Sequence, residues 1–124
     1  MRITKWTEYA VVMLQRLATC SGSVPVPMRA LADADKLPQD FAEQIMLKLR
    51  RACIVKSTRG AKGGYVLSIP VGALNMLQVF DAVEPDNYLV SLTTCPATVP
   101  MLVSLETAMR NTLAGMTLES TMPS

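Results

Sequence analysis

The sequence predicts one mainly α-helical domain with a small β-hairpin, followed by a long C-terminal helix. Apolar residues recur at helical spacing over residues 4–52. Two β-prone runs then flank the glycine-rich segment GAKGG (60–64). A last amphipathic stretch begins at Pro100. A length of 124 residues fits one domain with its own hydrophobic core.

The N-terminal segment predicts a helix over residues 4–19. Thr4 is suited to the N-cap because its hydroxyl can accept a hydrogen bond from a free backbone N–H. The segment CSGS (20–23) stops this helix. VPVP (24–27) then predicts an extended connector, since proline fixes φ and keeps the preceding residue out of the helical region.

Two further helices are predicted over residues 28–35 and 38–52, joined by the tight connection KLP (36–38). Pro38 is suited to the first helical position. A short helix, a tight turn and a longer helix with a polar and cationic outer face are typical of a helix-turn-helix. The inward positions of the longer helix are Phe41, Ala42, Ile45, Met46 and Leu49.

The runs IVKSTR (54–59) and YVLSI (65–69) predict a hairpin, which makes the unit a winged helix-turn-helix. The glycine loop fits neither a Walker loop, which needs GxxxxGK, nor a dinucleotide fingerprint, which opens a helix. Gly63 and Gly64 are expected to take positive φ, with Arg59 and Lys62 at the tip. The alternative is an ordinary solvated turn.

The remaining chain predicts a packing helix within residues 73–84, with Asn75 as its cap, and a helix over 100–116. The spacing of apolar residues on this last helix is close to a coiled-coil seam, which favours self-association into a homodimer over intramolecular packing. The seam positions are Leu102, Leu105, Met109, Leu113 and Met116.

Charge is divided unevenly along the chain. Residues 1–62 carry eleven Lys and Arg against five Asp and Glu, whereas residues 63–124 carry one Arg against five acids. Six cations lie within residues 48–62, where there is no acid. This imbalance indicates a polyanionic partner for the N-terminal half, double-stranded DNA in a helix-turn-helix; a solvated helix face is the alternative.

The longer helix and the wing supply the candidate DNA-binding residues. Gln44 suits adenine, Glu43 suits cytosine, and Lys48 suits guanine or phosphate, although each is also an ordinary exposed side chain of a helix. The full candidate set is Gln39, Glu43, Gln44, Lys48 and Arg51 on the helix and Arg59, Gly60, Lys62, Gly63 and Gly64 in the wing.

Catalytic and secretory functions are not indicated. The chain has no histidine, which removes Ser-His-Asp and Cys-His arrangements and most zinc sites, so no enzyme activity is expected. The three cysteines are widely spaced and odd in number, which fits a reducing cytoplasm. Neither a signal peptide nor a membrane-spanning run is evident, so no membrane partner is expected.

The segments MRITKWTEYA, FAEQIMLKLRRACIV, STRGAKGGYVLSIP and LNMLQVFDAVE together resemble the Rrf2 family of bacterial transcription regulators. The resemblance runs in order over residues 1–84, about two thirds of the chain. It implies a winged helix-turn-helix dimer with the longer helix in the major groove and the wing in the minor groove. It also implies a C-terminal helix that crosses to the partner subunit. Gln44, Lys48, Arg59 and Lys62 would face DNA.

The resemblance weakens in the loop where cluster-binding members of this family carry three cysteines. Here PDNYLVSLTTCP holds only Cys95, which matches the third family cysteine, and Leu92 lies near the first position. An iron–sulfur cluster usually needs four ligands, so no cofactor is expected. Glu8 matches an acidic ligand position of some family sensors, which keeps a cluster shared across a dimer as an alternative.

The sequence therefore predicts a homodimeric, sequence-specific DNA-binding regulator, with repression as the expected outcome. Residues 1–84 form the DNA-binding domain, 85–99 a shortened sensor loop, and 100–124 the dimerisation helix and tail. The alternatives are a redox-responsive regulator that uses Cys95, and an interaction module that kept the fold without binding DNA. Cys20 and Cys53 are expected to be packing residues.

Overall fold

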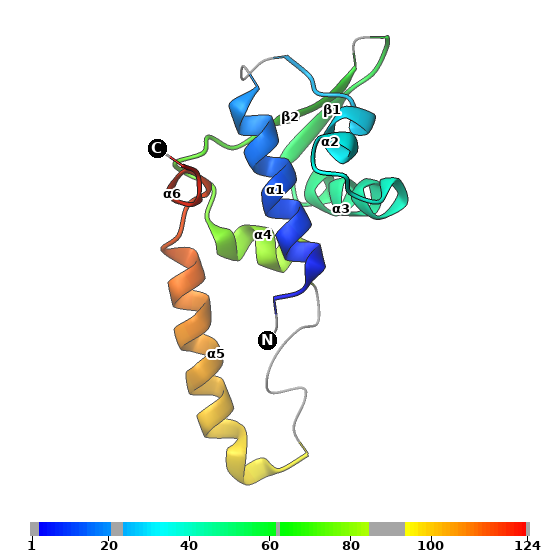
Figure 1. Cartoon of the computed structure of the whole chain (residues 1–124). Coiled ribbons are helices and arrows are strands. Elements are labelled where there is room, and N and C mark those ends of the chain that lie inside the picture. Colours follow the sequence, from blue (N-terminus) through cyan, green and yellow to red (C-terminus); the bar gives the residue numbers. More distant parts are fainter. Residues whose placement is uncertain (1–2, 21–23, 62, 85–93, 124) are drawn as a thin grey trace.

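The computed structural model describes residues 3–20, 24–61, 63–84 and 94–123 of the chain (Figure 1). It is mainly helical with one two-stranded antiparallel hairpin, as the sequence predicts. The elements are α1 (Lys5–Thr19), α2 (Met28–Ala34), α3 (Gln39–Arg51), β1 (Val55–Thr58), β2 (Gly64–Leu67), α4 (Met76–Val83), a 3-10 helix (Pro96–Thr98), α5 (Val99–Ala114) and α6 (Leu118–Thr121).

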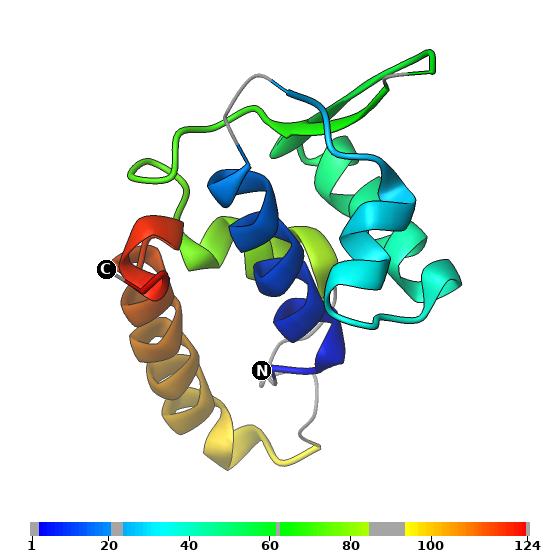
Figure 2. The same ribbon diagram turned by 45° about the horizontal axis from the view of Figure 1, so that its top comes forward.

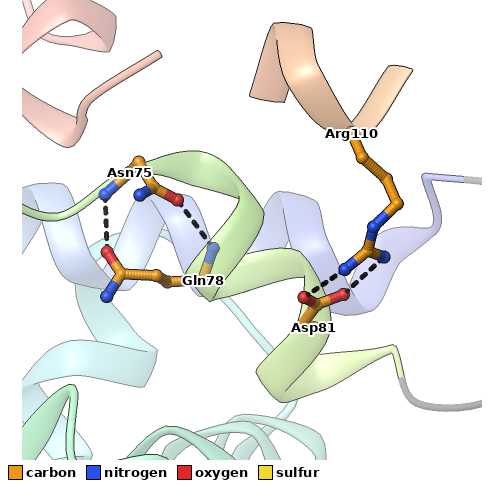
Figure 3. Close-up of polar contacts among 4 residues, drawn as sticks. All are labelled: Asn75, Gln78, Asp81 and Arg110. Atoms are coloured by element: carbon orange, nitrogen blue, oxygen red, sulfur yellow. Dashed lines mark hydrogen bonds and ion pairs between the residues drawn. The ribbon is translucent and has the colours of Figure 1, made fainter. Parts of the chain in front are cut away.

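Side-chain caps fix the starts of α1 and α4. The Thr4 hydroxyl accepts a hydrogen bond from the Trp6 N–H at the start of α1. Asn75 and Gln78 form a capping box at the start of α4, each side chain accepting from the other's backbone N–H at 2.9 Å (Figure 3). Both predicted caps are confirmed. Pro38 is the N-cap of α3 rather than its first helical residue.

The core lies where α1, α3 and α4 meet, with α2 and the base of the hairpin closing its edges (Figures 1 and 2). Phe41 packs against two aromatic rings of α1, with ring centroids 4.3 Å from Trp6 and 5.5 Å from Tyr9. These contacts fix the angle between α1 and α3. The fully buried large side chains include Met13, Leu14, Leu31, Ile45, Met46, Leu49, Leu74, Phe80 and Leu118.

The hairpin pairs Val55 with Leu67 and Thr58 with Gly64, which leaves its tip projecting beyond the helices (Figure 1). The connector before α2 adds a short third pairing to it. The Val26 N–H donates to the Tyr65 carbonyl, and the Tyr65 N–H donates to the Val26 carbonyl, both at 2.9 Å. The base of the hairpin is therefore tied directly to the segment that leads into α2.

Helix α5 projects away from the other helices (Figures 1 and 2), and none of its residues is fully buried. It ends at Ala114, so the helix expected to reach residue 116 is shorter. The chain then returns to α4: the Met76 N–H donates to the Met116 carbonyl at 2.7 Å. Leu118 of α6, a helix not predicted from the sequence, is fully buried in the core.

Across the residues described above, no helix has both the length and the apolar character that crossing a bilayer requires.

Candidate nucleic-acid interface

The outer face of α3 is the first component of the interface. Helix α2, a tight turn and α3 form a helix-turn-helix, and α3 buries Ala42, Ile45, Met46 and Leu49. Its opposite side leaves the predicted reading residues Gln39, Glu43, Gln44 and Arg51 exposed. A shallow hollow on this side is lined by Asp40, Glu43, Gln44 and Leu47. The helical period therefore separates a core face from a polar face in the way a reading helix requires.

Glu43 is held by a neighbour on the same face. The Gln39 side-chain amide donates to the Glu43 carboxylate at 3.1 Å, one helical turn away. This contact limits the rotamers of Glu43 and leaves its other carboxylate oxygen for a partner. Gln44, beside it, has an exposed amide that carries both a donor and an acceptor.

Lys48 differs from the other predicted reading residues because it is half-buried. Its Nζ lies 4.9 Å from the centroid of the Trp6 ring, a cation–π contact that joins α3 to α1. The ammonium therefore sits at the edge of the reading face, anchored by α1.

Cations gather where α3 ends and the hairpin begins. Arg50 and Arg51 end α3 and are exposed, and Lys56 is exposed on β1. The Arg50 guanidinium donates to the Ser57 hydroxyl at 3.4 Å, so α3 and β1 are connected through a cationic side chain. Cations near the C-terminus of a helix are favoured by its dipole, which helps to explain their placement here.

The hairpin tip carries Arg59, which is exposed, and Gly60, whose φ is 108°. The Gly63 N–H donates to the Gly60 carbonyl at 2.9 Å and closes the turn. Positive φ was expected at Gly63 and Gly64, but it occurs at Gly60 and Gly64. Gly63 is needed for space instead, because a Cβ there would lie 2.4 Å from the Thr58 carbonyl oxygen. Lys62 lies outside the described residues.

Cys53 is not the packing residue that the sequence suggested. It is exposed and has a φ of 62°, the left-handed conformation that commonly follows the end of a helix. The Cys53 N–H donates to the Arg50 carbonyl at 2.9 Å and the Ile54 N–H donates to the Leu49 carbonyl at 3.0 Å. The turn lets Ile54 enter the core while Cys53 faces outward at the junction of α3 and the wing.

The loop expected to sense a signal is described only from residue 94 onward. Cys95 is exposed and precedes the 3-10 helix, whose Thr98 hydroxyl donates to the Cys95 carbonyl at 2.8 Å. Glu8 is exposed in the first turn of α1. Among the residues that the structure places, no three Cys, Asp or Glu side chains come together as metal ligands. Leu92 lies outside them.

The donor set of this chain does not fit the iron–sulfur cluster that the resemblance suggests. Cys95 is the only cysteine between residues 54 and 124, and the chain has no histidine. Clusters are held mainly by cysteine thiolates, usually four of them. Cys95 and Glu8 of two chains would together supply two thiolates and two carboxylates, which differs from the four thiolates of the usual site.

The predicted seam of α5 divides into two parts. Leu113 packs against the chain's own core and Leu102 is half-buried. Leu105 and Met109 are exposed, and Met116 is exposed but lies beyond the end of α5. The exposed apolar strip therefore differs from the predicted seam, and we define it by Ile3, Met101, Leu105 and Met109. Ile3, Met109 and Leu113 also line one apolar hollow together with Ala108 and Thr112.

Sequence reasoning assigned no role to Glu84, yet its carboxylate is buried and holds the start of α1. It accepts hydrogen bonds from the Thr4 N–H at 3.1 Å, from the Thr4 hydroxyl and from the Thr7 hydroxyl. Thr4 in turn caps α1, so a continuous set of hydrogen bonds joins the C-terminal end of α4 to the first turn of α1. Two threonines three residues apart near an N-cap were the available signal.

The comparisons with known proteins agree on one family. The model of the Rrf2 family, described as iron-dependent transcriptional regulators, matches residues 3–123. The HTH-type transcriptional regulator IscR of Cronobacter sakazakii is 33% identical over 84 residues, which is 68% of this chain and 52% of that protein. The chain thus spans about half the length of the curated relatives it matches.

Solved structures extend the similarity to nearly the whole chain. CymR, the global cysteine regulator of B. subtilis, superposes with a TM-score of 0.81 at 28% identity, covering 98% of this chain and 95% of that one. T. potens IscR gives a TM-score of 0.79 at 25% identity, covering 98% and 85%. These proteins are transcriptional regulators rather than enzymes. With the family model matched from the first turn to the last and the winged helix-turn-helix in place, this chain belongs to the Rrf2 family.

Proposed function

We propose that this protein is a sequence-specific DNA-binding transcriptional regulator that binds its operator as a homodimer and represses transcription. The observation that carries the proposal is the exposed polar face of α3, which ends in cations and continues into a cationic wing. Such an arrangement offers base-reading and phosphate-binding groups on one side of the molecule.

The dimensions of α3 suit a major groove. Thirteen residues give a helix about 20 Å long, and a groove about 12 Å wide admits a helix of this kind. Gln44 would make a paired hydrogen bond to adenine, and Glu43 would accept from the cytosine amino group. Sequence preference therefore depends on the middle of α3.

The cations beside this face serve the DNA backbone. Lys48, anchored over Trp6, and the exposed Arg50 and Arg51 lie along the second half of α3, and Arg59 lies on the wing. Phosphate contacts fix register and carry no sequence information, and they make affinity strongly dependent on salt. The wing cations would reach an adjacent minor groove, where negative potential is enhanced.

Dimer formation is supported by the strip of Ile3, Met101, Leu105 and Met109. Three of these large apolar side chains are exposed on one helix, α5, which has no fully buried residue, and such an exposed apolar group marks a site of association. A second copy related by two-fold symmetry would cover the same strip on both chains and place two α3 helices on successive major-groove faces. The operator would then be a palindrome.

The proposal includes no resident iron–sulfur cluster. Its support is the donor set, one loop cysteine and no histidine. The absorption spectrum and iron content of anaerobically purified protein test this point: no visible bands and no bound iron are expected, and stoichiometric iron with broad visible bands would overturn it.

Binding selection tests the function directly. The protein is incubated with duplexes of randomised sequence, bound duplexes are amplified over several rounds, and the enriched palindrome is tested by gel shift. We expect one enriched palindrome, weaker binding by Gln44→Ala, and reduced run-off transcription from a promoter overlapping that palindrome. Failure to enrich any duplex would instead support an interaction module without DNA binding.

Sedimentation of two variants tests the dimer. Leu105→Glu places a charge in the strip and is expected to give monomers, because an unpaired charge in an apolar interface is strongly unfavourable. Thr107→Glu makes the same charge change at an exposed polar position of α5 and is expected to stay dimeric. Dimers from both variants would exclude this strip as the interface.

A further inference from the structure

Leu47 is an apolar residue at the centre of the polar face of α3. It is 37% exposed, and it lies on the opposite side of α3 from Ala42, Ile45, Met46 and Leu49, which fill the core. It therefore lies outside the core. Single exposed leucines are common on protein surfaces, so what points to a partner here is the position of Leu47 among the polar residues of this face.

The neighbours of Leu47 are the reading residues. Glu43 and Gln44 lie four and three positions before it, which places all three side chains together on the helix surface. With Asp40 they line the same shallow hollow. Arg51, four positions after Leu47, adds an exposed cation to the same side. This surround of two carboxylates, one amide and one cation offers hydrogen-bonding groups of the kind that pair with base edges, and it does not fit an apolar protein surface.

The major groove offers a specific apolar group, the C5 methyl of thymine. We propose that Leu47 reads that methyl, so that each half-site of the operator carries a thymine in the base pair next to the one that Gln44 contacts. This inference rests on the proposed function, because it requires α3 in the major groove. It adds a specificity residue that carries no hydrogen-bonding group.

The test removes the methyl and the leucine separately. In the palindrome enriched by binding selection, each thymine is replaced in turn by deoxyuridine, which lacks only the C5 methyl. Dissociation constants are measured for the parent protein, for Leu47→Ala, and for Leu47→Met, which keeps an apolar side chain of similar volume. Leu47 is exposed, so circular dichroism should show all three proteins equally folded.

For the parent, one deoxyuridine position is expected to weaken binding about fourfold per half-site and about fifteenfold when both half-sites carry it. Leu47→Ala should bind the thymine and deoxyuridine duplexes equally, and Leu47→Met should retain most of the difference. The proposal is overturned if no deoxyuridine substitution weakens binding by the parent. It is also overturned if the deoxyuridine that weakens the parent weakens Leu47→Ala by the same factor. Because both outcomes require a bound duplex, they are distinct from failure of DNA binding itself.

Discussion

Arg110 of α5 and Asp81 of α4 form a two-point ion pair, with Nη1 to Oδ1 at 3.1 Å and Nη2 to Oδ2 at 2.9 Å (Figure 3). Arg110 is the only Lys or Arg in residues 63–124. The pair fixes α5 against the helix that supports the core. It therefore helps to set the position of the exposed apolar strip relative to α3.

Removing this pair should affect DNA binding more than folding. Both side chains are partly exposed, so Asp81→Asn should lower the free energy of unfolding by only about 0.5 kcal/mol. A less constrained α5 should relax the distance between the two α3 helices of a dimer. Two duplexes are compared, the selected palindrome and a version whose half-site spacing is changed by one base pair. We expect the ratio of their affinities to be smaller for Asp81→Asn than for the parent. Unchanged discrimination would show that the pair does not set the spacing.

Cys53→Gly should stabilise the protein. A residue with a Cβ at φ 62° is strained by about 1–2 kcal/mol, and glycine is free of that strain but has more freedom in the unfolded chain. The net gain in the free energy of unfolding should be about 0.5–1 kcal/mol by urea denaturation. Cys53→Ala keeps the Cβ and serves as the control, with no gain expected. Equal stability of the two variants would contradict this account of the turn.

Gly64→Ala should damage the wing more than Gly60→Ala. Both glycines have positive φ, but a Cβ on Gly64 would lie 2.3 Å from the Val26 carbonyl oxygen, whereas none of the surrounding atoms lies within 4 Å of a Cβ on Gly60. Gly64→Ala therefore costs both the backbone strain and the pairing of Val26 with Tyr65, which the new Cβ would break. We expect the free energy of unfolding to fall by about 2–4 kcal/mol for Gly64→Ala and by about 1 kcal/mol for Gly60→Ala. The reverse order would contradict the role assigned to the connector.

Glu84→Gln should destabilise the start of α1. The buried carboxylate accepts from the Thr4 N–H and from the hydroxyls of Thr4 and Thr7, and an amide has one acceptor atom where the carboxylate has two. We expect a loss of about 1–3 kcal/mol in the free energy of unfolding. Glu8→Gln changes an exposed carboxylate in the first turn of α1 and should lower the free energy of unfolding by less than about 0.5 kcal/mol. Equal losses would show that Glu84 is not a structural acceptor.

Helices α1, α2, α3, α4 and α5, the hairpin and the polar face of α3 followed from local patterns in the sequence. Helical spacing of apolar residues, the N-caps Thr4 and Asn75, and the glycines between β-prone runs each depend on residues near one another in the chain. The structure confirms these predictions.

The features that the sequence did not predict depend on contacts between distant residues. Glu84 reaches Thr4 across eighty positions, and Leu118 returns to the core after α5 has left it. Cys53 was predicted to be a packing residue because its neighbours are apolar, and nothing in the local sequence indicates the left-handed turn at this position. Lys48 was expected to contact guanine or phosphate, and its contact with Trp6 was not predicted because it depends on the packing of α1 against α3.

The central claim is that α3 and the wing bind DNA through cations beside a reading face. The most direct measurement is the salt dependence of affinity, by fluorescence anisotropy, for the duplex enriched by selection. Arg59→Ala and Lys62→Ala are compared with the parent, and Arg16→Ala serves as the control because Arg16 already pairs with Asp35 at 3.2 Å.

Each lost phosphate contact should reduce the slope of log K against log salt by about 0.9 per site, or about 1.8 for a dimer. We predict this reduction for Arg59→Ala and Lys62→Ala, with unfolding free energies unchanged, and no reduction for Arg16→Ala. Slopes identical to the parent for both wing variants would contradict the account.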